Sequence, residues 1–354
     1  MIRVLLVDDS PLVLHVLQRM LSRFSEIKVV GTAADGREAL ELVPTLNPDV
    51  ICTDLHMLVM DGLEFTCAVM DKYPRPILVV SVSVEPGSPN VFRLLEAGAV
   101  DILPKPRDIM NGDMDRLANE LASKIRILAG VKVFRRHNTY GVVTTKHLPE
   151  RTVIPNLPAM SLGTRTPFRI VVIGASTGGP QAFRNILGQL PANFPLPVVC
   201  VQHIGSSFLS ELVAWLAEVT PLPVRKAKSG EIPHAGVVYF APEDTHLELD
   251  DGGHFVLSAT ESIDGHRPSV TATMCSVARC FGAATVGVLL TGMGRDGADG
   301  MASITASGGV TIAQDEASST VYGMPKQAVE LGVVKYVLPL EQIAPMLCGL
   351  VSQK

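Results

Sequence analysis

The chain has 354 residues, too many for one ordinary hydrophobic core, so its length alone predicts about two domains. The formal net charge is -5 and no Lys/Arg-dense stretch lies on a recognisable helix-turn-helix or zinc finger, which disfavours nucleic acid as a partner. Because no apolar run reaches the roughly 18 residues of a membrane span and MIRVLLVDDS does not fit a cleavable signal, we expect a cytoplasmic protein that is not membrane-embedded.

Five apolar runs rich in Val and Ile alternate with helix-like spacers in the first third of the chain. This alternation predicts a five-stranded parallel sheet with helices between the strands. The first helix is expected to begin at Ser10-Pro11, an N-cap followed by a proline in the first turn. The expected strands are IRVLLV (2–7), KVVG (28–31), DVICT (49–53), PILVV (76–80) and AVDIL (99–103).

The composition changes between residues 124 and 169, where nine Lys/Arg face a single acidic residue, Glu150. Prolines and glycines interrupt this stretch, and little sustained periodicity follows Val133. The pattern predicts a helix that runs out into a flexible linker. Its basic residues are compatible with partner docking and with a plain solvated linker.

A second series of apolar runs begins at Phe168 and again alternates with helix-like segments. It predicts a second open α/β sheet, doubly wound and mainly parallel. The expected strands lie in FRIVVIGAS (168–176), PVVCVQH (197–203), GVVYFAP (236–242), TVGVLLTG (285–292) and GVTIAQD (309–315).

Three carboxylates occupy strand ends in the N-terminal half. Asp8 and Asp9 follow the first strand, and Asp54 follows the third. Because loops at the carboxyl ends of parallel strands form the ligand crevice, we expect these side chains to converge and to bind Mg2+. The metal would neutralise charge on an arriving phosphoryl group, with Asp54 as its acceptor. Each carboxylate taken alone is at least as compatible with a solvated turn.

Two further polar residues complete this pattern. The fourth strand ends at Ser81, whose hydroxyl can bond a phosphoryl oxygen, and the fifth leads to Lys105, which offers a cation. With these residues the N-terminal half resembles response-regulator receiver domains over its whole length. The resemblance implies a flavodoxin-like fold, phosphorylation at Asp54, a Mg2+ site that Asp8 and Asp9 help to form, and switch roles for Ser81 and Lys105.

The receiver pattern departs at two places. The usual M-P-x-M-D-G after the phosphoacceptor reads MLVMDG, with Leu58 in place of proline, and Ile102 stands where many receivers carry a switch aromatic. The phosphorylation chemistry is expected to survive both changes, whereas the mode of signal transmission and the degree of activation stay open.

The segment VVIGASTGGP (171–180) joins an apolar strand, a G-x-S-x-G turn and a helix that starts with proline. This is the context of a nucleophile elbow, in which glycines leave room around a serine whose Oγ points outward. A dinucleotide-binding loop competes with it, but Ser176 stands where G-x-G-x-x-G needs glycine, and no acidic residue ends the next strand. Ser176 is therefore the candidate nucleophile.

A histidine and an aspartate follow other strands of the same sheet. His203 closes the second strand, beside the loop of the first, and is the candidate general base. The Gly-rich loop after TVGVLLTG presents Asp296, a candidate to orient that histidine. A lone histidine or turn aspartate is usually structural, so the assignment depends on all three. Their order along the chain differs from the Ser, Asp, His order of α/β-hydrolases.

The second half carries a closer resemblance, on the segments GASTGGP, QHI, GHRPSV, TGMGRDGADGM and AQDEASSTVYGMPKQA. Over nearly the whole of this half they are similar to the catalytic domain of chemotaxis protein-glutamate methylesterases, the CheB family. The resemblance implies Ser176, His203 and Asp296 as the catalytic triad and no cofactor for the esterase reaction. It places the oxyanion hole at Thr177 and Met293.

The two resemblances together imply a receiver domain at 1–122, a linker at 123–167 and a methylesterase domain at 168–354. The implied enzyme is activated by a chemotaxis histidine kinase and hydrolyses glutamate methyl esters on the cytoplasmic domains of chemoreceptors. Some family members also deamidate receptor glutamines. We expect a monomer.

Two departures in the second half bear on substrate docking. Thr271 stands where the family often has aspartate, and the loop after His203 lacks the family's proline. Two other functions stay open: a receiver-regulated scaffold with an inactive hydrolase domain, and a hydrolase of small esters. Nothing in the sequence indicates the deep apolar pocket or lid that the second would favour.

Overall fold

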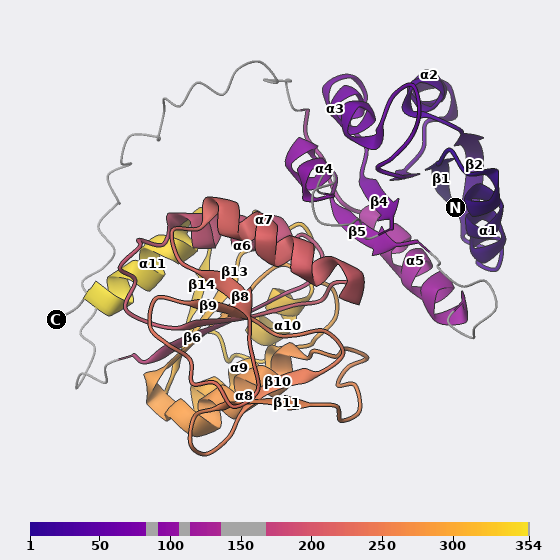
Figure 1. Ribbon diagram of the computed structural model, residues 1–354. Coiled ribbons are helices and arrows are strands. Elements are labelled where there is room, and N and C mark those ends of the chain that lie inside the picture. Colours follow the sequence, from indigo (N-terminus) through magenta and orange to yellow (C-terminus); the bar gives the residue numbers. More distant parts are fainter. Residues whose placement is uncertain (83–90, 106–113, 136–167, 353–354) are drawn as a thin grey trace.

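A computed structural model describes residues 1–82, 91–105, 114–135 and 168–352 (Figure 1). These ranges form two α/β units, each built on a parallel sheet. Within them, every helix is too short or too polar to span a bilayer. Most of the predicted linker lies outside the described residues.

The N-terminal unit is a five-stranded parallel sheet of order β2-β1-β3-β4-β5, as the alternation predicts. Ser10 caps the first helix, because its hydroxyl accepts a hydrogen bond from the Val13 amide. The strands are β1 (Ile2–Val7), β2 (Ile27–Ala33), β3 (Val50–Thr53), β4 (Ile77–Ser81) and β5 (Asp101–Pro104). The helices are α1 (Pro11–Leu21), α2 (Gly36–Leu46), α3 (Gly62–Lys72), α4 (Phe92–Ala97) and α5 (Met114–Leu128).

The C-terminal unit has a seven-stranded parallel sheet of order β14-β13-β12-β6-β7-β9-β8 and a separate antiparallel hairpin, β10-β11. All five predicted strands are present, whereas β8, β10, β11 and β14 were not predicted. The strands are β6 (Ile170–Ala175), β7 (Val198–Gln202), β8 (Val224–Lys226), β9 (Val238–Phe240), β10 (His246–Leu249), β11 (Phe255–Ser258), β12 (Thr285–Leu289), β13 (Val310–Gln314) and β14 (Tyr336–Leu338). The helical elements are α6 (Gly179–Gln189), η1 (Ser206–Phe208), α7 (Leu209–Val219), α8 (Val270–Phe281), η2 (Gly282–Ala284), α9 (Ala298–Ala306), α10 (Met324–Glu330) and α11 (Leu340–Ser352).

The strand order reverses direction at β6, which pairs with β7 on one side and with β12 on the other. Loops diverge at such a point, which opens a crevice at the carboxyl ends of the strands. Helix α8 packs closely on β6 there, since a Cβ added at Gly174 would lie 2.2 Å from a Val270 methyl. The crevice between β6, β7 and β12 is where the candidate catalytic residues lie.

The two units contact each other in two places: α4 of the first packs on α6 and α7 of the second, and β5 and α5 reach the loops that follow β6 and β12. The Phe92 ring of α4 stacks on Trp215 of α7 with centroids 5.2 Å apart, and the indole nitrogen donates to Glu96 at 2.9 Å. The Gln181 amide of α6 donates to the carbonyls of Leu95 and Ala99. One apolar cluster therefore includes buried residues of both units.

Candidate active site and phosphoacceptor site

Ser176 lies at the tight turn between β6 and α6. Its amide donates to the Thr291 carbonyl at 3.0 Å, which ties the turn to the loop after β12. Gly178 has φ 80°, a left-handed conformation that favours glycine. A Cβ added at Gly292 would lie 2.7 Å from the Ser176 Cβ, so this glycine lets the two loops approach. The geometry is that of the predicted elbow.

His203 immediately follows β7 and therefore stands next to Ser176. Ala175 pairs with Gln202 in the parallel register of β6 and β7, and the His203 amide donates to the Ala175 carbonyl at 3.0 Å. The Gln202 side-chain amide donates to the carbonyls of both Ser176 (2.9 Å) and His203 (2.8 Å). Gln202 thus holds the two turns together, a role that sequence reasoning missed.

Asp296 is almost fully buried, and four hydrogen bonds hold its carboxylate. The His203 Nε2 lies 2.8 Å from Oδ2, and the Ser269 hydroxyl donates to Oδ1 at 2.8 Å. The amides of Val270 (2.7 Å) and Thr271 (2.9 Å) donate from the first turn of α8, where the helix dipole favours an anion. Burial alone would raise the pKa of Asp296, but its hydrogen bonds from His203 and α8 hold it well below the usual range.

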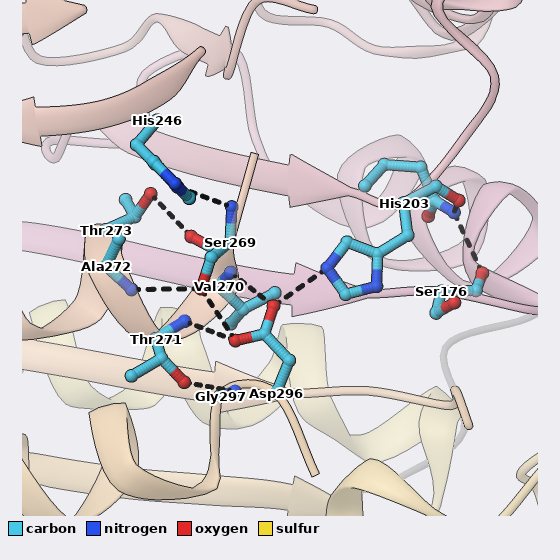
Figure 2. Close-up of polar contacts among 11 residues, drawn as sticks. Ser176, His203, His246, Ser269, Val270, Thr271, Ala272, Thr273, Asp296 and Gly297 are labelled. Carbon is cyan, nitrogen blue, oxygen red and sulfur yellow. Dashed lines mark hydrogen bonds and ion pairs between the residues drawn. The ribbon is translucent and has the colours of Figure 1, made fainter. Parts of the chain in front are cut away.

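The proton on the His203 ring is fixed by this arrangement. An ionised carboxylate only accepts hydrogen bonds, so Nε2 carries the proton and Nδ1 is the free base. Among the described residues, Nδ1 is buried without a hydrogen-bond partner. Figure 2 shows the ring between the Asp296 carboxylate and Ser176, with Nδ1 on the Ser176 side. The structure therefore places the three predicted residues side by side, with an unpartnered ring nitrogen on the side of the serine.

A second serine and histidine, Ser269 and His246, lie close to Asp296 (Figure 2), but their contacts are structural. Ser269 is fully buried, caps α8 by accepting from the Ala272 amide, and donates its hydroxyl proton to Asp296. The Ser269 backbone amide donates to His246 Nδ1, and His246 Nε2 lies 3.0 Å from the Glu261 carbonyl oxygen. Both side chains are occupied in fixing the loop that holds Asp296.

The two predicted oxyanion-hole positions both meet the N-terminal unit. The Thr177 hydroxyl donates to Oδ2 of Asp101, in β5, at 2.8 Å. The Lys124 ammonium of α5 donates to the same Asp101 oxygen at 2.5 Å. Met293 is 46% exposed, and its sulfur lies 3.8 Å from the Ser123 hydroxyl of α5. The N-terminal unit therefore covers residues next to Ser176.

The predicted phosphoacceptor residues also converge, at the carboxyl end of the first sheet. The Lys105 ammonium lies 2.7 Å from a carboxylate oxygen of Asp8 and 2.7 Å from one of Asp54. Asp8, Asp9 and Asp54 each offer an oxygen within 4.8 Å of the others. Burial raises the pKa of Asp8, while hydrogen bonds to Asp54 and Asp8 outweigh burial and raise the pKa of Lys105. The acidic cluster is typical of a receiver Mg2+ site.

The remaining receiver positions have distinct environments. Ser81 ends β4, is fully buried, and its carbonyl accepts from the Lys105 amide. Leu58 is exposed in the loop after Asp54, whereas Ile102 is buried in the cluster shared by both units. The departure at Ile102 thus places an aliphatic side chain in the core beside the interdomain contact.

Comparison with known proteins agrees with both halves of the chain. The family model for the CheB methylesterase matches residues 171–347, and that for the response regulator receiver domain matches residues 4–112. A protein-glutamate methylesterase/protein-glutamine glutaminase of Nitrosospira multiformis is 40% identical over 356 residues, covering 100% of this chain and 98% of the relative. A protein of Geobacter metallireducens with the same description is 41% identical over 358 residues, covering 100% of both.

A solved structure agrees with the second unit. The CheB methylesterase catalytic domain of Thermotoga maritima is 41% identical with a TM-score of 0.51, covering 52% of this chain and 100% of that domain. The resemblance on the sequence motifs is thereby confirmed. The chain belongs to the CheB family of protein-glutamate methylesterases and glutaminases, in which an N-terminal receiver domain regulates the hydrolase.

Proposed function

We propose that this protein removes methyl esters from glutamates of chemoreceptor cytoplasmic domains in the cytoplasm, by a Ser176-His203-Asp296 triad. The observation that carries this proposal is the placement of the His203 ring between Ser176 and the Asp296 carboxylate, which accepts four hydrogen bonds. The Nδ1 atom of His203 is free to accept a proton. We assign the receiver to residues 1–122, the linker to 123–167 and the methylesterase to 168–354, and we propose that the protein acts as a monomer.

In the first step, His203 Nδ1 accepts the proton of Ser176 as Oγ attacks the ester carbonyl. The buried Asp296 carboxylate stabilises the imidazolium without taking its proton. The amides of Thr177 and Met293 are our candidates to hold the oxyanion. Collapse of the tetrahedral intermediate breaks the bond to the methoxy group, which takes the proton from His203 and leaves as methanol.

In the second step, water attacks the glutamyl ester on Ser176. His203 accepts a proton from that water and returns it to the serine Oγ, which releases a free glutamate. Replacing the methoxy leaving group by ammonia gives glutamine deamidation with the same residues. The relatives' description as glutaminases supports this second reaction for the present chain.

We propose that a chemotaxis histidine kinase phosphorylates Asp54 with Mg2+ held by Asp8, Asp9 and Asp54. Three converging carboxylates suit a hard cation, which supplies charge neutralisation for phosphoryl transfer when bound. Lys105 already bonds Asp8 and Asp54 and offers the cation for a phosphoryl oxygen, and Ser81 offers the switch hydroxyl.

Regulation then follows from the contact between the units. The N-terminal unit bonds Thr177 through Asp101 of β5 and touches Met293 through Ser123 of α5, so in this arrangement it obstructs the approach of a receptor helix to Ser176. Phosphorylation is proposed to weaken this contact. A preference of about 1.4 kcal/mol for the open state changes the open-to-closed ratio tenfold.

The decisive measurement is methanol release from methylated chemoreceptor cytoplasmic fragments. Wild type and Ser176→Ala are each assayed with and without phosphodonor and Mg2+. We expect release that requires Ser176 and rises with phosphodonor. No release by wild type on several receptors, together with full biological function of Ser176→Ala, would instead favour a receiver-regulated scaffold.

A further inference from the structure

The imidazole of His266 lies flat against that of His203. The two ring centroids are 3.7 Å apart and the ring planes differ by 8°. His266 comes from the segment before α8, far from β7 in the sequence. The catalytic histidine is therefore fixed in the ring plane by Asp296 and covered on one face by a second histidine.

The backbone around His266 presents this ring rigidly. Ile263 and His266 exchange both backbone hydrogen bonds across Asp264 and Gly265, which have φ 50° and 80°. Asp-Gly is the preferred pair for such a two-residue turn with positive φ at both positions. An ion pair of 3.7 Å between Asp264 and Arg295 ties the turn to the loop that carries Asp296.

The surroundings of His266 favour its neutral form. Burial, followed by the nearby His203 ring and the Lys124 ammonium of α5, lowers the pKa of His266 to about 4 against the opposing effect of Asp296. A neutral aromatic face attracts a cation, whereas a second imidazolium would repel one. His203 becomes an imidazolium each time Ser176 attacks, so the charge state of its stacked neighbour matters at that step.

We propose that His266 is a positioning residue for the esterase reaction: its neutral ring holds the His203 imidazole in line between Asp296 and Ser176 and stabilises the imidazolium that forms on attack. This inference rests on the proposed function. The proposed role needs a flat aromatic ring at position 266 but does not need a nitrogen in that ring. It predicts an effect on kcat and not on substrate binding.

The test compares His266→Ala and His266→Phe with wild type in the methanol-release assay, after activation by phosphodonor. Aromatic stacking is worth a rate factor of about three to ten, so we expect His266→Ala to lower kcat by about that factor with KM changed less than about twofold. His266→Phe should recover most of the lost kcat. Exposed His234, changed to Ala, is the matched control and should behave like wild type.

An unchanged kcat in His266→Ala would overturn the inference. A His266→Phe variant as slow as His266→Ala would also overturn it, because a ring nitrogen would then be needed. A rise in KM alone would assign His266 to substrate binding. Thermal unfolding of each variant separates a lost fold from a slowed reaction. Wild-type release that does not depend on Ser176 would overturn the proposed function itself, whichever way the His266 variants behave.

Discussion

The Thr177 hydroxyl donates a 2.8 Å hydrogen bond to the Asp101 carboxylate, so the residue after the candidate nucleophile is held by the other domain. Asp101 also accepts from Lys124 and, through its other oxygen, from the Ile102 amide. These bonds place one carboxylate of β5 between the receiver core and the elbow. Asp101 thus links the receiver sheet directly to the turn that carries Ser176.

Asp101→Ala should raise the activity of the unphosphorylated protein. Loss of a hydrogen bond to a charged group weakens the closed state by about 1.5 kcal/mol or more. We therefore expect methanol release without phosphodonor to rise about tenfold, because about 1.4 kcal/mol changes the open-to-closed ratio tenfold. With phosphodonor, the variant and wild type should reach the same rate, because the receiver is then displaced in both.

Asp115→Ala is the matched control for this prediction. Asp115 is also a carboxylate of the receiver, but it pairs with Arg23 at the surface. Surface pairs contribute about 0–1 kcal/mol, so basal release should stay unchanged. If Asp101→Ala and Asp115→Ala gave the same basal rate, the Thr177 contact would not be part of the inhibition.

The sequence predicted the sheets and the convergence of the candidate residues for a simple physical reason. Buried parallel strands have near-continuous apolar runs, and residues that follow such strands share one edge of the sheet. Ser176, His203 and Asp296 could be found in this way. The apolar runs are too short to predict a strand in four elements, which are the three-residue strands β8 and β14 and the two strands of the β10-β11 hairpin.

Other parts of the site depend on contacts that no local pattern encodes. The amides that hold Asp296 are backbone groups of α8, which any residue type supplies, so their role was not visible in GHRPSV. Thr271 was noted only as a departure, yet its hydroxyl accepts from the Gly297 amide and fixes the Asp296 loop. The Asp101 contact depends on how two separate units pack, which strand periodicity does not determine.

Asp296→Asn should abolish most of the esterase activity without unfolding the protein. An amide in place of the carboxylate no longer stabilises the His203 imidazolium or fixes the proton on Nε2. We expect kcat to fall about 10³- to 10⁴-fold with KM little changed. Asp299→Asn is the control, because Asp299 forms only an exposed pair with Arg295 at 2.9 Å. A fall of less than tenfold in Asp296→Asn would contradict the assigned role of Asp296.

Lys105→Ala should strengthen Mg2+ binding while it weakens phosphorylation. The Lys105 ammonium neutralises Asp8 and Asp54 in the absence of metal, so its removal leaves two buried carboxylates facing each other. We expect a lower Mg2+ Kd and a larger rise in Tm on adding Mg2+ than in wild type, with less phosphate incorporated at Asp54. The exposed Lys28→Ala serves as control. A Mg2+ Kd equal to or above that of wild type would exclude competition between Lys105 and the metal.

His266 should make the stability of the protein depend on pH below neutrality. Its pKa falls from 6.5 to about 4 on folding, so between these values the unfolded chain binds more protons than the folded one. Stability therefore rises with pH across this window, is fully present above about pH 6.5, and is lost as pH falls towards 4. Because one pKa unit corresponds to about 1.4 kcal/mol, the whole effect is no more than about 3.5 kcal/mol.

His266→Phe isolates this contribution, because the variant keeps a flat ring but cannot bind a proton. Denaturant unfolding at pH 7.5 and at pH 4.5 gives the free energy of unfolding of each protein. Wild type should lose more stability between the two pH values than His266→Phe does, while His234→Phe, at an exposed histidine, should lose as much as wild type. Equal losses in wild type and His266→Phe would mean that His266 titrates normally in the folded protein, and a second positive charge would then face His203 at mildly acid pH.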